Sequence, residues 1–107
     1  MEKEYFGEVT VRTEEEQDIK LTYNLLKSTV IDTVSGIRVY GVEIVKEHPF
    51  GRHGKEAKLV RELFIRKAEA EEFLAKLKRN KVTPMGLKYV ISDYFCEKNQ
   101  EMVVNSN

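Results

Sequence analysis

The chain has 107 residues, of which 41% are hydrophobic and 34% charged, and its 18 basic and 18 acidic side chains cancel. This length suits one domain with its own core, and the composition is typical of a folded globular protein rather than a disordered one. The single cysteine, Cys96, excludes an internal disulfide, and no stretch approaches the roughly 20 apolar residues of a membrane span. The charged start, MEKEYFGEVT, lacks the apolar centre of a signal peptide, so we expect a cytoplasmic protein with no membrane segment.

The first elements show the alternation of apolar and polar residues that is typical of strands with one buried face. In residues 5–12, Tyr5, Val9 and Val11 fall on the apolar side, and the acidic stretch TEEEQD then predicts a solvated reversal. Residues 19–25 resume the alternation. The phase slips at Leu25–Leu26, which predicts a bulge or a bend in a long strand.

The next elements continue the same pattern. DTVSG, residues 32–36, predicts a hairpin connection, and residues 37–46 predict a third strand. Gly41 inside that strand indicates a bulge or a close approach of another backbone. After the loop HPFGRHGKE, residues 58–65 predict a fourth strand, with the start of a helix as the alternative.

The period then becomes helical. One apolar stripe at helical spacing predicts a helix that Asn80 ends, and it consists of Ala70, Phe73, Leu74 and Leu77. Thr83 as N-cap and Pro84 at the first position predict a second helix. Its apolar stripe consists of Leu87, Val90, Ile91, Tyr94 and Phe95. From about Glu97 the period is lost, and we expect residues 98–107 to fray.

These elements predict an α+β fold in which an antiparallel meander of about four strands is followed by two C-terminal helices packed on one face. We expect residues 1–97 to form a single domain.

Three segments, YFGEV, YGVEIVKE and KVTPMGLKYVISDYF, together resemble a family of small, uncharacterised clostridial (Firmicutes) proteins. The resemblance covers most of the chain but not the loop HPFGRHGKE, the acidic reversal or the tail. It implies a bacterial cytoplasmic protein whose family has no assigned activity, cofactor or functional residues.

The loop HPFGRHGKE holds the two histidines of the chain. His48 and His53 supply at most two nitrogen ligands, fewer than a zinc site needs, so we expect no metal. GRHG matches the G-x-x-G clamp of nucleic-acid-binding KH domains, but that clamp joins two helices, and here we interpret the loop as a bend between strands. Cys96 lies near a helix C-terminus, where the dipole disfavours a thiolate, so we interpret it as a semi-buried filler.

The candidate contact residues are basic. Lys76, Lys78, Arg79 and Lys81 form a cluster, and Arg52, His53 and Lys55 add positive charge in the loop. Basic residues at a helix C-terminus also satisfy the helix dipole without any ligand. Seven Lys/Arg stand against ten Asp/Glu up to Gly54 and eleven against eight beyond it, a weaker asymmetry than nucleic acid binding favours.

No catalytic constellation and no cofactor site assembles from these residues, so we expect a non-enzyme. We predict a non-catalytic interaction module that binds a protein partner, or itself as a homodimer, through a sheet edge or an uncovered sheet face. The alternative is a weak nucleic-acid binder that uses the basic cluster at 76–81.

Overall fold

The computed structural model describes residues 1–30, 36–48 and 54–105, and the side chains of these ranges up to residue 97. One antiparallel sheet in the order β1-β2-β3-β4 consists of β1 (Glu2–Arg12), β2 (Asp18–Val30), β3 (Ile37–Glu47) and β4 (Lys55–Phe64). Helix α1 (Lys67–Arg79), the 3-10 turn η1 (Pro84–Gly86) and helix α2 (Leu87–Asn105) follow. The predicted α+β meander with two C-terminal helices is confirmed, and residues 58–65 are strand up to Phe64.

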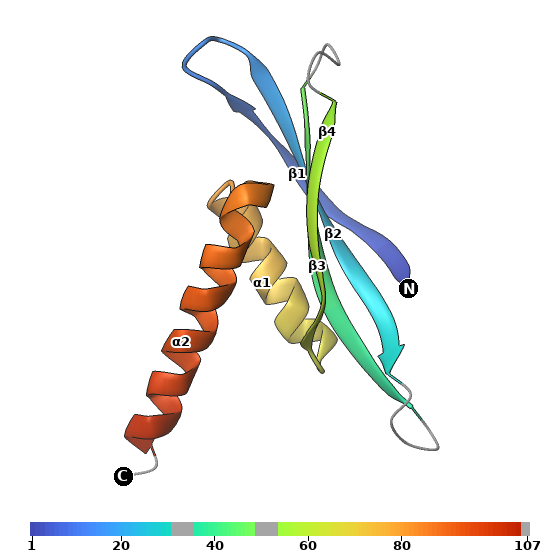
Figure 1. Ribbon diagram of the computed structural model, residues 1–107, viewed down its shortest axis with the longest axis vertical. Helices are drawn as coiled ribbons and strands as arrows, with labels where there is room; N and C mark the ends of the chain where they lie inside the picture. The colour runs from blue at the N-terminus through green and yellow to red at the C-terminus, as the bar shows by residue number, and fades with distance from the viewer. Residues whose placement is uncertain (31–35, 49–53, 106–107) are drawn as a thin grey trace.

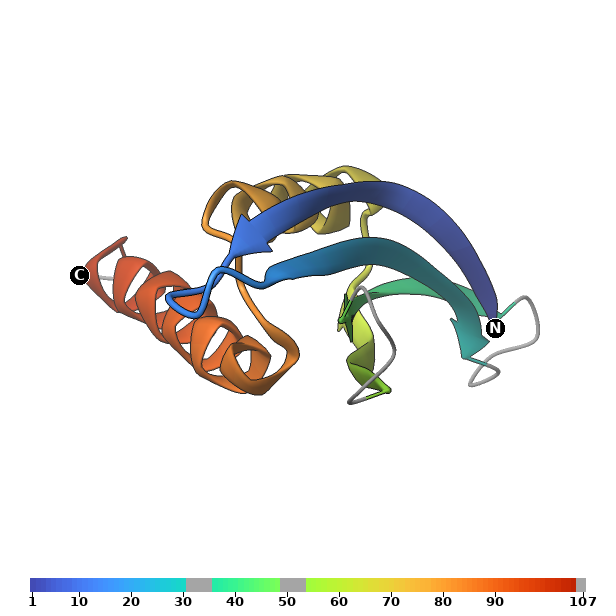
Figure 2. The same cartoon turned by 90° about the horizontal axis from the view of Figure 1, so that it is seen from above.

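Both helices lie on the same side of the twisted sheet, and α2 diverges from α1 so that its C-terminal end is far from the strands (Figures 1 and 2). The predicted stripe of α1 is buried against the sheet, because residues spaced three and four apart share one helix face. The core brings together Leu21, Tyr23, Leu25, Val42, Ile44, Phe64, Ala70, Phe73, Leu74, Leu77 and Leu87.

The other face of the sheet carries no helix in the part of the chain that the structure describes (Figure 2). Glu43 is only 3% exposed on this face, where Lys3 pairs with its carboxylate at 3.0 Å and the Asn24 amide donates to it at 2.9 Å. Lys20 and Glu8 also pair there, at 3.9 Å. Charged and amide side chains paired along the strands are typical of a face that meets water.

Strand β1 contains a bulge that changes the expected faces. Its register with β2 shifts between Tyr5 and Gly7, so Phe6 is the extra residue and packs against the core. The prediction that Tyr5 shares the apolar side with Val9 and Val11 is wrong, because the bulge turns Tyr5 to the helix-free face, where it is 60% exposed.

The predicted bulge at Leu25–Leu26 is also wrong, whereas the alternative, a bend of the strand, stays a prediction. The register of β2 runs without a shift through both residues on both sides. Leu25 belongs to the helix-side core, whereas Leu26 is buried on the other face beside Gly41. The shift lies in the β3–β4 pairing, between Tyr40 and Val42, which confirms that Gly41 marks an irregularity and a close backbone approach.

The second helix starts at the predicted cap and extends farther than the apolar period does. Thr83 is the N-cap as expected, and its hydroxyl accepts a hydrogen bond from the Gly86 amide at 3.4 Å. The first turn is the 3-10 turn η1, with Pro84 buried. The backbone stays helical beyond Glu97 to Asn105, and the expected fraying of residues 98–107 stays a prediction. Among the described residues, neither helix combines the length and the apolar character that crossing a membrane requires.

Candidate functional site: a groove beside strand β4

A groove runs between the outer edge of the sheet and the start of the second helix, with a volume of about 540 Å³. We call it the edge groove. Its apolar lining consists of Leu59, Val60, Pro84, Met85, Leu87 and Ile91. Met85 is 70% exposed at the rim, so its apolar side chain remains open to a partner.

Two lysines flank this apolar lining, Lys58 from β4 and Lys88 from α2. Both are exposed, and neither pairs with a carboxylate within the described residues. The Lys88 ammonium lies 5.1 Å from the Tyr89 ring centroid. The groove therefore offers an apolar floor between two positive charges.

The local sequence explains why the chain turns here. Helix α1 ends in a Schellman motif, in which the Lys81 amide donates to Lys78 O at 3.1 Å and the Val82 amide to Leu77 O at 3.0 Å. Lys81 takes the left-handed conformation, with a φ of 53°. The buried Tyr23 hydroxyl then donates to Val82 O at 2.9 Å, which ties this turn to β2.

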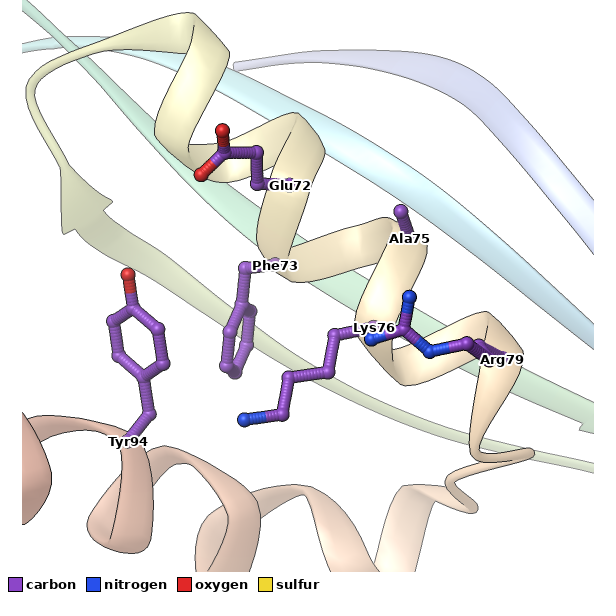
Figure 3. A pocket seen from close by; sticks show the side chains of 6 residues that line it. All are labelled: Glu72, Phe73, Ala75, Lys76, Arg79 and Tyr94. Atoms are coloured by element: carbon purple, nitrogen blue, oxygen red, sulfur yellow. The ribbon is translucent and has the colours of Figure 1, made fainter.

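A second hollow of about 340 Å³ lies between the two helices (Figure 3). We call it the helix cleft. Its lining consists of Glu72, Phe73, Ala75, Lys76, Arg79 and Tyr94. Lys76 points toward the Tyr94 ring, with its ammonium 5.8 Å from the ring centroid.

The structure separates the predicted basic cluster. Lys76 and Arg79 line the helix cleft. The Lys78 side chain lies across Gly7 of β1, because its ammonium is 3.1 Å from the point where a Cβ on Gly7 would stand. Lys81 is exposed in the turn that ends α1.

Of the three basic residues predicted in the loop, the structure describes only Lys55. Arg52 and His53 lie outside the described residues. Lys55 is exposed in β4 and lies 3.9 Å from Glu47 of β3. Among the described side chains, no three or more His, Cys, Asp or Glu gather as a metal site would require. Cys96 is exposed, so the interpretation as a semi-buried filler is wrong.

Sequence reasoning missed the edge groove because its residues come from two segments, 58–60 and 84–91, that no motif joins. One signal was present. Met85 follows the cap Thr83–Pro84 directly, and the first turn of a helix that packs on a sheet edge leaves one such position at the rim.

Comparison with known proteins gives a family and no activity. Residues 2–97 match a family described as a family of unknown function, DUF6514. Searches of curated proteins and of solved structures returned no match. The family without assigned activity agrees with the expected resemblance, whereas a clostridial origin stays a prediction. Because the match covers most of the chain, the chain belongs to the DUF6514 family.

Proposed function

We propose that the protein is a non-catalytic interaction module that binds an extended segment of a partner protein in the edge groove. The segment lies along β4, places an apolar side chain between Val60 and Met85, and carries acidic residues on either side. The observation that supports this proposal is an apolar groove beside an edge strand, flanked by two lysines without carboxylate partners in the described part of the chain.

The position of β4 supports an extended ligand. Within the described residues β4 pairs only with β3, so its outer edge is open to another strand. The regular pairing covers residues 55–60 of β4, and the register then shifts, which limits the length of a paired segment. Alternate side chains of such a segment would point toward the groove, because side chains alternate along a strand.

The charges support an acidic partner. Lysines on an edge strand discourage pairing with arbitrary strands, since their ammonium groups must stay hydrated or be paired. A segment with carboxylates beside its apolar anchor satisfies both Lys58 and Lys88. The helix-free face is the weaker candidate for binding, because its charged groups are already paired with one another.

The proposal is tested with short fluorescent peptides that have the same strand-forming, apolar centre and either glutamate or lysine flanks. We expect the protein to bind the glutamate peptide at least about tenfold tighter than the lysine peptide. The double variant Lys58→Glu/Lys88→Glu reverses this preference. Lys20→Glu, on the helix-free face, keeps it. Fluorescence anisotropy at two salt concentrations measures the affinities.

A second measurement tests the strand pairing and the identity of the partner. N-methylation of alternate amides on the edge-facing side of the glutamate peptide abolishes binding if the peptide pairs with β4. The proposal is overturned if the glutamate peptide does not saturate the protein, or if the charge reversal leaves the preference unchanged. A dimeric mass in light scattering that the charge reversal abolishes would instead assign the groove to a second copy of this chain.

A further inference from the structure

The helix cleft contains two neighbouring cations that the chain itself leaves without acidic partners. Lys76 and Arg79 stand three residues apart on α1, so both reach the same face of the helix. Neither forms an ion pair with a carboxylate within the described residues. Figure 3 shows the Arg79 guanidinium beside the start of the Lys76 side chain, whose ammonium extends toward Tyr94, so the two cations stand one after the other along the α1 wall of the cleft.

An aromatic wall faces these cations. The Tyr94 ring packs against Phe73 with centroids 5.1 Å apart and against Phe64 at 5.9 Å, so two phenylalanines fix its position. The contact between the Lys76 ammonium and the Tyr94 ring keeps the lysine directed into the cleft. The site is therefore largely pre-formed, as small-molecule sites commonly are.

The other end of the cleft limits the charge of a ligand. Glu72 also lines the cleft, and its carboxylate is directed away from Lys76 (Figure 3). A second anionic group at that end would be repelled, whereas a hydroxyl or amino group could donate to the carboxylate. One anionic group beside Lys76 and Arg79 satisfies both cations.

The volume indicates a ligand larger than a simple ion. A space of about 340 Å³ equals roughly ten water molecules, so a phosphate group fills only part of it. We propose that the helix cleft binds a small phosphate monoester with a planar ring, its phosphate between Lys76 and Arg79 and its ring against Tyr94. This site is separate from the edge groove and does not depend on the function proposed for that groove.

The probe is phenyl phosphate, with inorganic phosphate and phenol as the two partial ligands. Titration followed by ¹⁵N–¹H NMR of the full chain reports affinity and location together. We expect saturable shifts at Lys76, Arg79 and Tyr94, with phenyl phosphate bound at least about tenfold tighter than either partial ligand. Equal affinity for phenyl phosphate and inorganic phosphate would show that the ring does not contribute to binding, which overturns the proposal. Chemical shifts that do not saturate would also overturn it.

Two double variants with equal loss of charge provide the control. Lys76→Gln/Arg79→Gln weakens binding of phenyl phosphate at least about tenfold, because both charge-assisted contacts are lost. Lys78→Gln/Lys81→Gln removes two charges from the same helix end outside the cleft and leaves the affinity unchanged. Equal weakening by both pairs would overturn the proposal. A short RNA whose binding both pairs reduce equally would also overturn it, in favour of a diffuse phosphate-binding surface.

Discussion

At the scale of single residues, Tyr23 connects the sheet to the turn beneath the edge groove. Its side chain is fully buried, and its hydroxyl donates to Val82 O at 2.9 Å. Burial raises the pKa of Tyr23 to about 12, because the phenolate is poorly solvated in the core. The neutral form is therefore the form that stabilises the fold.

Replacing Tyr23 by Phe removes the hydroxyl, so the Val82 carbonyl loses this hydrogen bond. We expect the free energy of unfolding to fall by about 1–2 kcal/mol at neutral pH, the usual effect of losing one partner of a buried hydrogen bond. Urea unfolding followed by circular dichroism measures this change. Tyr89→Phe is the matched control, because Tyr89 is 62% exposed, and it should change stability little.

Comparison of the wild type with Tyr23→Phe also tests a predicted pH dependence of stability. Below pH 10 the phenol is protonated in both states, and its contribution is fully present. As the pH rises from 10 toward 12, the unfolded state loses its proton first, so the wild type loses stability that Tyr23→Phe cannot lose. The difference between the two proteins should shrink over this window. A constant difference would show that burial does not shift the ionisation of Tyr23.

At the scale of elements, the crossing of β4 over β3 depends on Gly41. A Cβ on Gly41 would stand 2.0 Å from Val60 O and 2.5 Å from Arg61 O, both of them backbone atoms. The absence of this side chain lets β4 approach closely and leave its regular register with β3. Leu26 pairs with Gly41 and is fully buried on a face that no helix covers in the described residues.

We expect Gly41→Ala to lower the free energy of unfolding by roughly 1–3 kcal/mol or more, because backbone oxygens cannot move aside as a flexible side chain can. Gly86→Ala is the control, since its Cβ would meet only the side chains of Thr83 and Val82, at 3.6 and 3.7 Å. Denaturant midpoints compare the two variants. Similar midpoints for both would contradict the close approach of β4.

These irregular strands show where sequence reasoning ends. Alternation predicted the strands, and helical spacing predicted α1 and its buried stripe, because both patterns are local. The bulge at Phe6 and the burial of Leu26 depend on which strand lies opposite, so the alternation places Tyr5 on the wrong face and misattributes the adjacent Leu25 and Leu26 to a bulge. Gly41 was the exception, because a glycine inside a strand indicates a close approach without naming its partner.

The candidate sites also include one that the helical period explains and one that only the tertiary structure reveals. Lys76 and Lys78 stand only two residues apart in the sequence, but side chains two residues apart on a helix differ by roughly 200° in direction. The period alone therefore separates the predicted basic cluster, and the structure places Lys76 in the helix cleft and Lys78 over Gly7. The edge groove needed tertiary structure, because β4 and η1 meet only after the chain has folded over α1.

At the scale of the whole molecule, the two helices are attached to the sheet to different degrees. Helix α1 packs its buried stripe directly on the strands. Helix α2 begins at the buried Leu87, and its Val90 and Ile91 pack against the core. Farther along, it contacts the fold through an aromatic cluster, in which Tyr94 and Phe95 meet Phe64 at 5.9 and 6.0 Å. Both proposed sites use α2, so its attachment controls both.

Since few buried contacts hold α2, its amides should open at lower free energy than those of β2 and β3. We expect Phe95→Ala to speed hydrogen exchange of α2 at least about tenfold, equal to 1.4 kcal/mol of opening free energy, with β2 and β3 nearly unchanged. Tyr89→Ala removes an exposed ring from the same helix and should leave both regions unchanged. Uniform acceleration in Phe95→Ala would show instead that α2 opens only with the whole fold.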